Sequence, residues 1–178
     1  MRQSAQPVGT VLIVTSSYPK HEGEPSGIFL HHLSRQLVAV GWRVLILAPN
    51  FPGGRAIQML HGVEIRRFNY FLPQRQALCY RSGMLPNLKQ SVLLWFQVPF
   101  YLASLFGSVL QTVRKESIDI INAHWVVPQG IVTRLVQSFL PVPVVLTVHG
   151  GDIFAFQGLV GRLLKRLALR GAGACSAH

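Results

Sequence analysis

The sequence predicts an α/β fold with a doubly wound, mostly parallel Rossmann-like sheet and helices on both faces. Short runs of β-branched and other apolar residues, such as 11–14 and 144–148, are typical of strands buried on both faces. Segments with helical patterning separate these runs, and repeated strand–helix–strand units produce a parallel sheet. Apolar residues make up 49% of the 178 residues, which is enough for a sizeable core in about one domain.

The first half of the chain is predicted to contain three strands and one helix. The strands cover residues 11–14, 43–48 and 63–68, and the third alternates in the manner of an edge strand or a strand with one wet face. Ser26 is a suitable cap for a helix over residues 27–40, which Gly41 ends. The apolar face of this helix is expected to include Phe29, Leu33 and Leu37.

The second half of the chain is predicted to continue the alternation. An irregular stretch to Pro86 precedes a long apolar helix over residues 88–115. The strands that follow cover residues 118–123, 142–148 and 173–176. A helix from Pro128 and a helix over residues 158–170 connect them, so each strand is again followed by a crossover.

The long apolar helix allows more than one interpretation. Residues 91–113 carry no charge, and such a run has the length of a membrane span. Its polar residues, however, form one narrow stripe at about 100° per residue: Gln90, Gln97, Ser104, Ser108, Gln111 and Lys115. Pro99 should kink or break the segment. The pattern favours a crossover helix buried on most sides, with an interfacial helix that dips into a membrane as the alternative.

The composition indicates which partners to expect. Seventeen Lys and Arg residues stand against six Asp and Glu, for a net charge of +11, which favours anionic partners such as an acidic membrane surface or phosphorylated ligands. Because the basic residues are scattered rather than concentrated in a run, we expect no nucleic-acid partner. Cys79 and Cys175 lack metal-ligand spacing, and the N-terminus lacks the apolar core of a signal peptide. These features predict a cytoplasmic location.

Chemistry-bearing residues follow several predicted strands. The run 144–148 ends in His149, Gly150, Gly151 and Asp152, the strand before it ends in His124 and Trp125, and Ser26 and Gly27 precede the first helix. Ligands of open parallel sheets bind beyond the carboxyl ends of the strands, so these residues are candidates for one site. Each group also has a structural explanation. Residues 149–152 could form a tight turn with a core histidine, His124 and Trp125 could be a packed aromatic pair, and Gly27 could permit close helix–sheet packing. His31 and His32 are expected to be solvated, and Cys175–Ser176 mark a further strand end.

Several classes of enzyme lack their motif in this chain. Strand one is not followed by G-x-G-x-x-G, and no Walker loop occurs, which disfavours nicotinamide enzymes and P-loop nucleotidases. No G-x-S-x-G elbow occurs, and the seven histidines include no H-x-x-x-H pair. We therefore predict no metal site.

The ordered set of motifs resembles the N-terminal domain of family 4 glycosyltransferases. Ser17-Tyr18-Pro19 with Gly23 and Ser26-Gly27 resembles the opening of that domain, and Asp119 to Trp125 with Pro128 and Gly130 resembles its mid-domain strand. Thr147 to Asp152 resembles its T-x-H-G-x-D strand end, and Gly173 to Ser176 its closing strand. The resemblance runs over nearly the whole chain.

The resemblance implies one half of an enzyme with two facing Rossmann-like domains (the GT-B fold). Residues 1–178 would be the acceptor-side domain, and the donor-binding C-terminal domain lies outside this chain. Members move a sugar from a nucleotide-sugar to an acceptor with retention of configuration, without a metal or other cofactor. The acceptor is expected to be lipid-linked or a cell-surface glycan precursor.

The resemblance also implies roles for the matching residues. His149 and Asp152 would be catalytic, with His149 on the transferred sugar and Asp152 toward the acceptor. Gly27 would lie near the donor phosphates, and His124 on the acceptor side. Ser26, Trp125, Gly150 and Gly151 complete the expected substrate-binding set.

Two further expectations concern the membrane. The basic face of helix 158–170, formed by Arg162, Lys165, Arg166 and Arg170, and the basic residues Arg66, Arg67, Arg75, Arg81 and Lys89 agree with an anionic membrane surface as partner. A different class of function stays open: a non-catalytic Rossmann-like module that binds an anionic ligand or a membrane.

Overall fold

The chain forms one mostly parallel sheet. The computed structural model describes residues 6–79, 83–149, 166 and 174–177. Their strands are β1 (Thr10–Val14), β2 (Arg43–Pro49), β3 (Ile57–Leu60), β4 (Val63–Phe68), β5 (Ile120–His124), β6 (Val144–Val148) and β7 (Ala174–Ala177). Their order is β3-β4-β2-β1-β5-β6-β7, and every pairing is parallel except β3 with β4. The predicted fold class is confirmed.

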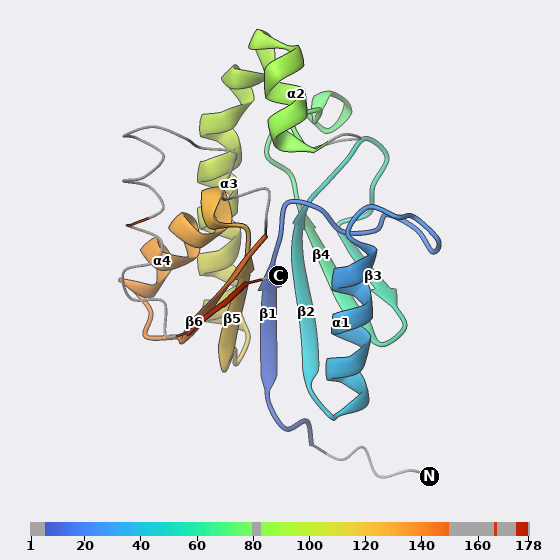
Figure 1. Cartoon of the computed structure of the whole chain (residues 1–178), viewed down its shortest axis with the longest axis vertical. Helices are drawn as coiled ribbons and strands as arrows, with labels where there is room; N and C mark the ends of the chain where they lie inside the picture. The colour runs from blue at the N-terminus through green and yellow to red at the C-terminus, as the bar shows by residue number, and fades with distance from the viewer. Residues whose placement is uncertain (1–5, 80–82, 150–165, 167–173, 178) are drawn as a thin grey trace.

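Helices cover both faces of this sheet (Figure 1). The α-helices in the described residues are α1 (Ile28–Ala39), α2 (Met84–Gln90), α3 (Gln97–Lys115) and α4 (Ile131–Gln137). Shorter helical segments are η1 (Pro73–Arg75), η2 (Val92–Phe96) and η3 (Val126–Gly130). Helix α1 lies on one face, and α3 and α4 lie on the other, while α2 stands beyond the carboxyl ends of β1 and β2.

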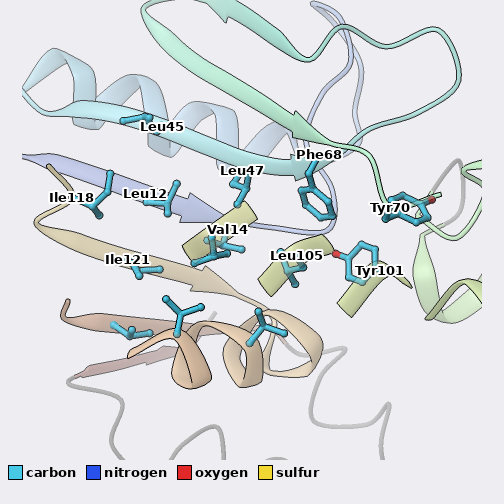
Figure 2. Packing of buried hydrophobic residues seen from close by; sticks show 14 of the residues in the cluster. Leu12, Val14, Leu45, Leu47, Phe68, Tyr70, Tyr101, Leu105, Ile118 and Ile121 are labelled. Atoms are coloured by element: carbon cyan, nitrogen blue, oxygen red, sulfur yellow. The ribbon is translucent and has the colours of Figure 1, made fainter. Parts of the chain in front are cut away.

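Alternate residues of the central strands supply two cores. On the α1 face, Ile13 and Ile46 pack with Leu30 in one cluster. On the opposite face, Leu12 and Leu45 belong to a larger cluster with Leu105, as Figure 2 shows. Because both faces are covered, these strands read as continuous apolar runs. This burial fixes the sheet, and with it the positions of the strand ends.

The edge of the sheet differs from the expectation. The strand predicted at residues 63–68 is β4, but it lies inside the sheet, because β3 pairs with it antiparallel. Ile57 and Met59 of β3 are exposed, so this strand has no apolar run to reveal it. His61 and Gly62 join the two strands with φ of 50° and 80°, two positive values that are typical of a tight hairpin turn.

Helix α1 has the predicted extent but a different orientation. Its buried residues are Leu30, His31 and Ser34, whereas Phe29 and Leu33 are 49% and 40% exposed. The predicted apolar face was therefore wrong for these two residues. Ser26 does not cap the helix: Gly27 is the N-cap residue, and the Ser26 Oγ lies 2.6 Å from the Ser17 Oγ.

The long apolar helix is divided, and it is less buried than predicted. Ser91 adopts an extended conformation that separates α2 from η2, and α3 begins at Gln97. Pro99 is tolerated in the first turn of α3, where an N–H group has no helical partner. Residues 92–115 are long and apolar enough to cross a membrane, yet only 22% of the most apolar window is buried. The expectation of burial on most sides was wrong, because only one face of α3 contacts the sheet.

Only part of the predicted structure near the end of the chain lies within the described residues. Strand β7 confirms the expected final strand. The predicted helix over residues 158–170, with its basic face, lies outside the described residues apart from Arg166, which is exposed.

Candidate functional site

Two histidines meet at the carboxyl edge of the sheet. His124 is the last residue of β5, and His149 follows β6, its neighbour in the sheet. The His124 Nδ1 lies 3.0 Å from the His149 Nε2, and the two rings stack at 24° with centroids 5.3 Å apart. His124 is 1% exposed, whereas His149 is half-buried. The inner histidine therefore positions the outer one.

Aromatic side chains surround this pair. The centroid of the Trp125 ring lies 4.6 Å from that of the His149 ring. The Phe29 ring of α1 makes an edge-to-face contact with the His149 ring, with centroids 5.2 Å apart. Trp125 has a φ of 79°, a left-handed value that is uncommon outside glycine. Its N–H donates to the Thr147 carbonyl at 3.1 Å, and its carbonyl accepts from the Gly130 N–H at 3.0 Å. The neighbouring segments thus hold Trp125 in the conformation that places its ring on His149.

The contact between the histidines limits their chemistry. A hydrogen bond between two ring nitrogens needs one donor and one acceptor, so the contact requires a proton on one of the two nitrogens and a lone pair on the other. It involves the Nδ1 of His124 and the Nε2 of His149. A histidine held in this way can accept or donate a hydrogen bond to a polar ligand, and the aromatic neighbours reduce the access of water.

A pocket lies beside this pair along the same edge. It is lined by Ser16, Ser17, Tyr18, Lys20, Ser26, Pro49, Asn50, Phe51, Arg67 and Cys79. The lining comes from the segments that follow β1 and β2 and from the end of β4. Hydroxyl, amide and cationic groups predominate among its polar members, so the pocket suits a polar ligand.

Arg67 is the buried charge of this pocket. It is 6% exposed, and its guanidinium donates to the carbonyls of Pro19 at 2.6 Å, Tyr18 at 3.4 Å and Pro49 at 3.4 Å. Burial lowers the pKa of Arg67 to about 10, which leaves it protonated at neutral pH. Its guanidinium carbon lies 5.0 Å from the centre of the Phe51 ring.

The structure brings some predicted site residues together. His124, Trp125 and His149 form one cluster, and Gly27 lies at the start of the helix that supplies Phe29. Ser26 lines the neighbouring pocket instead. Gly150, Gly151 and Asp152 lie outside the described residues, and of Cys175 and Ser176 only the strand is described.

Sequence reasoning missed three residues of this edge. Phe29 was assigned to the core, and Asn50 was not considered. Arg67 was counted with the surface charges. The sequence contains a signal for the burial of Arg67. Alternate residues of a strand point to the same face, so Arg67 points to the same face as the buried Val63 and Ile65.

Two other expectations need correction. His31 was expected to be solvated, but it is 4% exposed, and its Nδ1 lies 2.8 Å from the Tyr18 hydroxyl. Arg66 was grouped with Arg67 in a basic cluster, but it forms 2.6 Å ion pairs with Glu64 and Glu116. The described residues contain no group of three or more His, Cys, Asp or Glu that could hold a metal ion.

Curated proteins with similar sequences are glycosyltransferases. An uncharacterised glycosyltransferase of Methanocaldococcus jannaschii is 34% identical over 84 residues, which is 47% of this chain and 22% of that protein. A Bacillus subtilis glycosyltransferase named for teichuronic acid biosynthesis is 25% identical over 150 residues, 80% of this chain and 36% of that protein. The chain thus spans between a fifth and about a third of the length of these relatives.

Solved structures agree with the fold, and a family model agrees with the sequence likeness. Sucrose-phosphate synthase from Thermosynechococcus elongatus superposes with a TM-score of 0.61 at 12% identity, over 94% of this chain and 75% of the other. The catalytic domain of starch synthase IV from Arabidopsis thaliana superposes with a TM-score of 0.53 at 12% identity, over 80% of this chain and 34% of the other. The glycosyl transferase 4-like domain model matches residues 26–177. Since that match covers most of the chain, the protein belongs to the glycosyl transferase 4-like domain family, as the motifs predicted.

Proposed function

We propose that this chain is the acceptor-side half of an enzyme that transfers a sugar from a nucleotide-sugar to an acceptor. The transfer retains the anomeric configuration and needs no metal. The observation that carries this proposal is the His124–His149 pair at the carboxyl edge of the sheet, in a chain of a glycosyltransferase family. The donor-binding half belongs to the remainder of a longer protein, in keeping with the larger size of the relatives.

The proposed roles of individual residues rest on the family motifs and, for the described residues, on their contacts. His149 contacts the transferred sugar, where it can stabilise charge that develops at the reacting centre. Asp152 is proposed to act on the acceptor, and glycine at 150 and 151 would permit a close approach of the ligand. His124 and Trp125 fix the position of His149, which the 3.0 Å nitrogen contact and the 4.6 Å ring contact support.

The start of helix α1 is the proposed place of the donor phosphates. No side chain caps this helix, and its first turn contains no acidic residue. The N–H groups and the dipole of a helix N-terminus favour an anion. Phe29 in the same turn contacts His149, so phosphates near Gly27 lie beside the group that contacts the sugar.

The acceptor is proposed to be a lipid-linked or cell-surface glycan precursor. One relative is named for teichuronic acid biosynthesis, which is a precedent for such a glycan. The structure adds an apolar cap, defined as the exposed residues Leu72, Val92, Leu93, Trp95, Phe96 and Phe100. A patch of this kind marks an interaction surface.

The position and charge of the apolar cap favour a membrane. The segments that carry it adjoin α2, beyond the carboxyl ends of β1 and β2 (Figure 1). Arg75 and Lys89 nearby are exposed, and the sequence contains no acidic residue between Glu64 and Glu116. Aromatic and basic residues together suit an anionic membrane surface. We therefore propose a peripheral location at the cytoplasmic face of the membrane.

A donor panel tests the proposed transfer. The full-length gene product is incubated with each of several nucleotide-sugars, with and without a membrane extract as the source of acceptor, and nucleotide release is measured. Release with one donor that depends on the extract is the expected result. A folded protein that turns over no donor would instead support the non-catalytic module, which the cationic pocket and the apolar cap favour. A product of inverted anomeric configuration would contradict the retaining mechanism.

A further inference from the structure

The buried guanidinium of Arg67 has donors that the described part of the chain does not use. An arginine carries five N–H groups, and the three bonds to the carbonyls of Tyr18, Pro19 and Pro49 use three of them. The Nε of Arg67 is buried and has no hydrogen-bond partner within the described residues. An unused donor on a buried charge is costly, so such a group usually has a partner in the functional state.

No carboxylate in the described part of the chain compensates the charge of Arg67 through an ion pair. Glu24 is the acid whose charge acts on Arg67, but its carboxylate accepts from both the backbone N–H and the Nζ of Lys20, the latter at 2.7 Å. Lys20, Arg67 and Glu24 together therefore carry a net positive charge. A buried charge without a counter-charge is destabilising unless an anion supplies it.

The lining of the pocket completes an anion site. Lys20 and Arg67 face it together with the hydroxyls of Ser16, Ser17 and Ser26 and the amide of Asn50. The Nε–H of Arg67 can donate a charge-assisted hydrogen bond to a phosphate or carboxylate, and the serine hydroxyls can donate to the remaining oxygens. We propose that this pocket binds an anionic group, a phosphate or a carboxylate, that belongs to the sugar acceptor. This inference rests on the proposed function.

The proposed function assigns the anion to the acceptor rather than to the donor, because this chain is proposed to be the acceptor-side half. The pocket lies at the ends of β1, β2 and β4, whereas the histidine pair lies at the ends of β5 and β6. Because β1 and β5 are neighbours in the sheet, the two places adjoin, and Arg67 reaches the carbonyls of Tyr18 and Pro19 after β1. The donor phosphates are placed at Gly27, which adjoins Ser17 and Ser26 of the lining, so the pocket extends from that place toward Arg67 and Lys20. Arg67 and Lys20 are then specificity residues, not catalytic ones.

Binding of inorganic phosphate to the full-length protein tests the site without turnover. The stabilisation of the protein by phosphate is measured against chloride at matched ionic strength, which yields a Kd. Lys20→Gln is expected to weaken binding about tenfold, because a charge-assisted bond is lost. Glu24→Gln should strengthen binding, because it removes the neighbouring negative charge and keeps the acceptor oxygen. Arg114→Gln, at the exposed far end of α3, should leave binding unchanged.

Kinetics of transfer then identify which substrate carries the anion. Lys20→Gln and Arg67→Lys should raise the KM for the acceptor about tenfold and leave the KM for the donor unchanged, because only one ionic contact is altered. A change confined to the donor KM would assign the anion to the donor diphosphate and overturn the proposal. Equal phosphate binding by wild type, Lys20→Gln and Glu24→Gln would overturn the site itself. A protein that binds phosphate as predicted but transfers no sugar would refute only the proposed function.

Discussion

At the scale of single residues, Tyr18, His31 and His61 form a chain of hydrogen bonds. The Tyr18 hydroxyl lies 2.8 Å from the His31 Nδ1, and the His31 Nε2 lies 3.0 Å from the His61 Nδ1. Burial lowers the pKa of His31, and the nearby His61, Arg35 and His32 lower it further, although Glu22 opposes them. His31 is therefore neutral near pH 7, and it links the loop before α1 to the β3–β4 turn.

His31 should make the stability of the protein depend on pH. Because its pKa is lower in the folded state, the unfolded state binds more protons below about pH 6.5. The contribution of His31 to folding is complete above that pH and is lost as the pH falls toward the lowered pKa. Urea unfolding between pH 8 and pH 5 should show this loss in the wild type and a shallower loss in His31→Gln.

The matched control is His21, another exposed histidine, which is not among the groups that act on His31. His21→Gln should therefore keep the pH dependence of the wild type. An equal pH dependence in His31→Gln and wild type would contradict the assignment of the effect to His31.

Single residues of the site differ in how far the sequence predicts them. His124, Trp125 and His149 could be predicted, because each follows an apolar run whose end must reach the edge of a parallel sheet. The burial of His31 could not, because it depends on a turn that lies 30 residues away in the sequence.

At the scale of elements, the start of helix α1 depends on a close approach to the loop after β1. Gly27 has a φ of 73°, and a Cβ at this position would lie 2.7 Å from the Ser17 carbonyl oxygen. Neither the backbone conformation nor the space suits another residue. The position of α1 over the sheet edge, and with it that of Phe29, thus requires glycine at 27.

Replacement of this glycine should displace or destabilise the helix. Gly27→Ala combines an unfavourable backbone conformation with a clash against backbone, and is expected to cost about 2–4 kcal/mol of unfolding free energy. Gly23→Ala is the matched control, because Gly23 has a φ of 84° but a Cβ there would meet nothing within 4 Å. Its cost should be about 1–2 kcal/mol, from the backbone alone. Equal costs in the two variants, measured by chemical unfolding, would contradict the role of the Ser17 contact.

Most elements, but not all, could be predicted from the sequence. β1, β2, β4 and β6 follow from their apolar or alternating runs, which tertiary packing on both faces requires. β3 has only four residues, and its apolar Ile57 and Met59 are exposed, so it carries no such signal. The break at Ser91 was missed for a related reason: an uncharged run fits one helix as well as three shorter segments.

At the scale of the whole molecule, the six exposed apolar residues of the apolar cap gather at one end. Phe71, Phe96 and Phe100 contact one another with ring centroids 5.4 to 6.3 Å apart. Around them lie Trp95, which is 56% exposed, and the other members of the apolar cap. With a net charge of +11, the chain suits binding to an anionic surface at that end.

Binding to vesicles tests the role of the apolar cap. The double variant Trp95→Ser with Phe96→Ser should reduce co-sedimentation of the full-length protein with vesicles of mixed anionic and zwitterionic lipid at least tenfold, because two buried aromatic rings are worth several kcal/mol. Phe139→Ser removes an equally exposed aromatic residue from the segment after α4 and should have no effect. Undiminished binding by the double variant, or binding that does not depend on the content of anionic lipid, would contradict the proposed membrane surface.

The fold of the whole molecule was predictable because many weak signals occur in a consistent order. Four strand ends and their motifs follow one another at spacings that only a parallel α/β sheet explains, and the family match over residues 26–177 agrees. The extent of the apolar surface was not predictable, because burial of the uncharged helix depends on how many neighbours cover it.

The central claim is that His149 acts where the sugar is transferred, and its replacement in the full-length enzyme tests this claim most directly. His149→Ala and the exposed control His32→Ala are compared for kcat/KM in transfer of the sugar, with thermal unfolding as the check on folding. We expect His149→Ala to lower kcat/KM by about 10²- to 10³-fold while its Tm stays close to that of the wild type, because a preorganised polar group at the reacting centre is lost. Wild-type kcat/KM in a folded His149→Ala enzyme would contradict the claim.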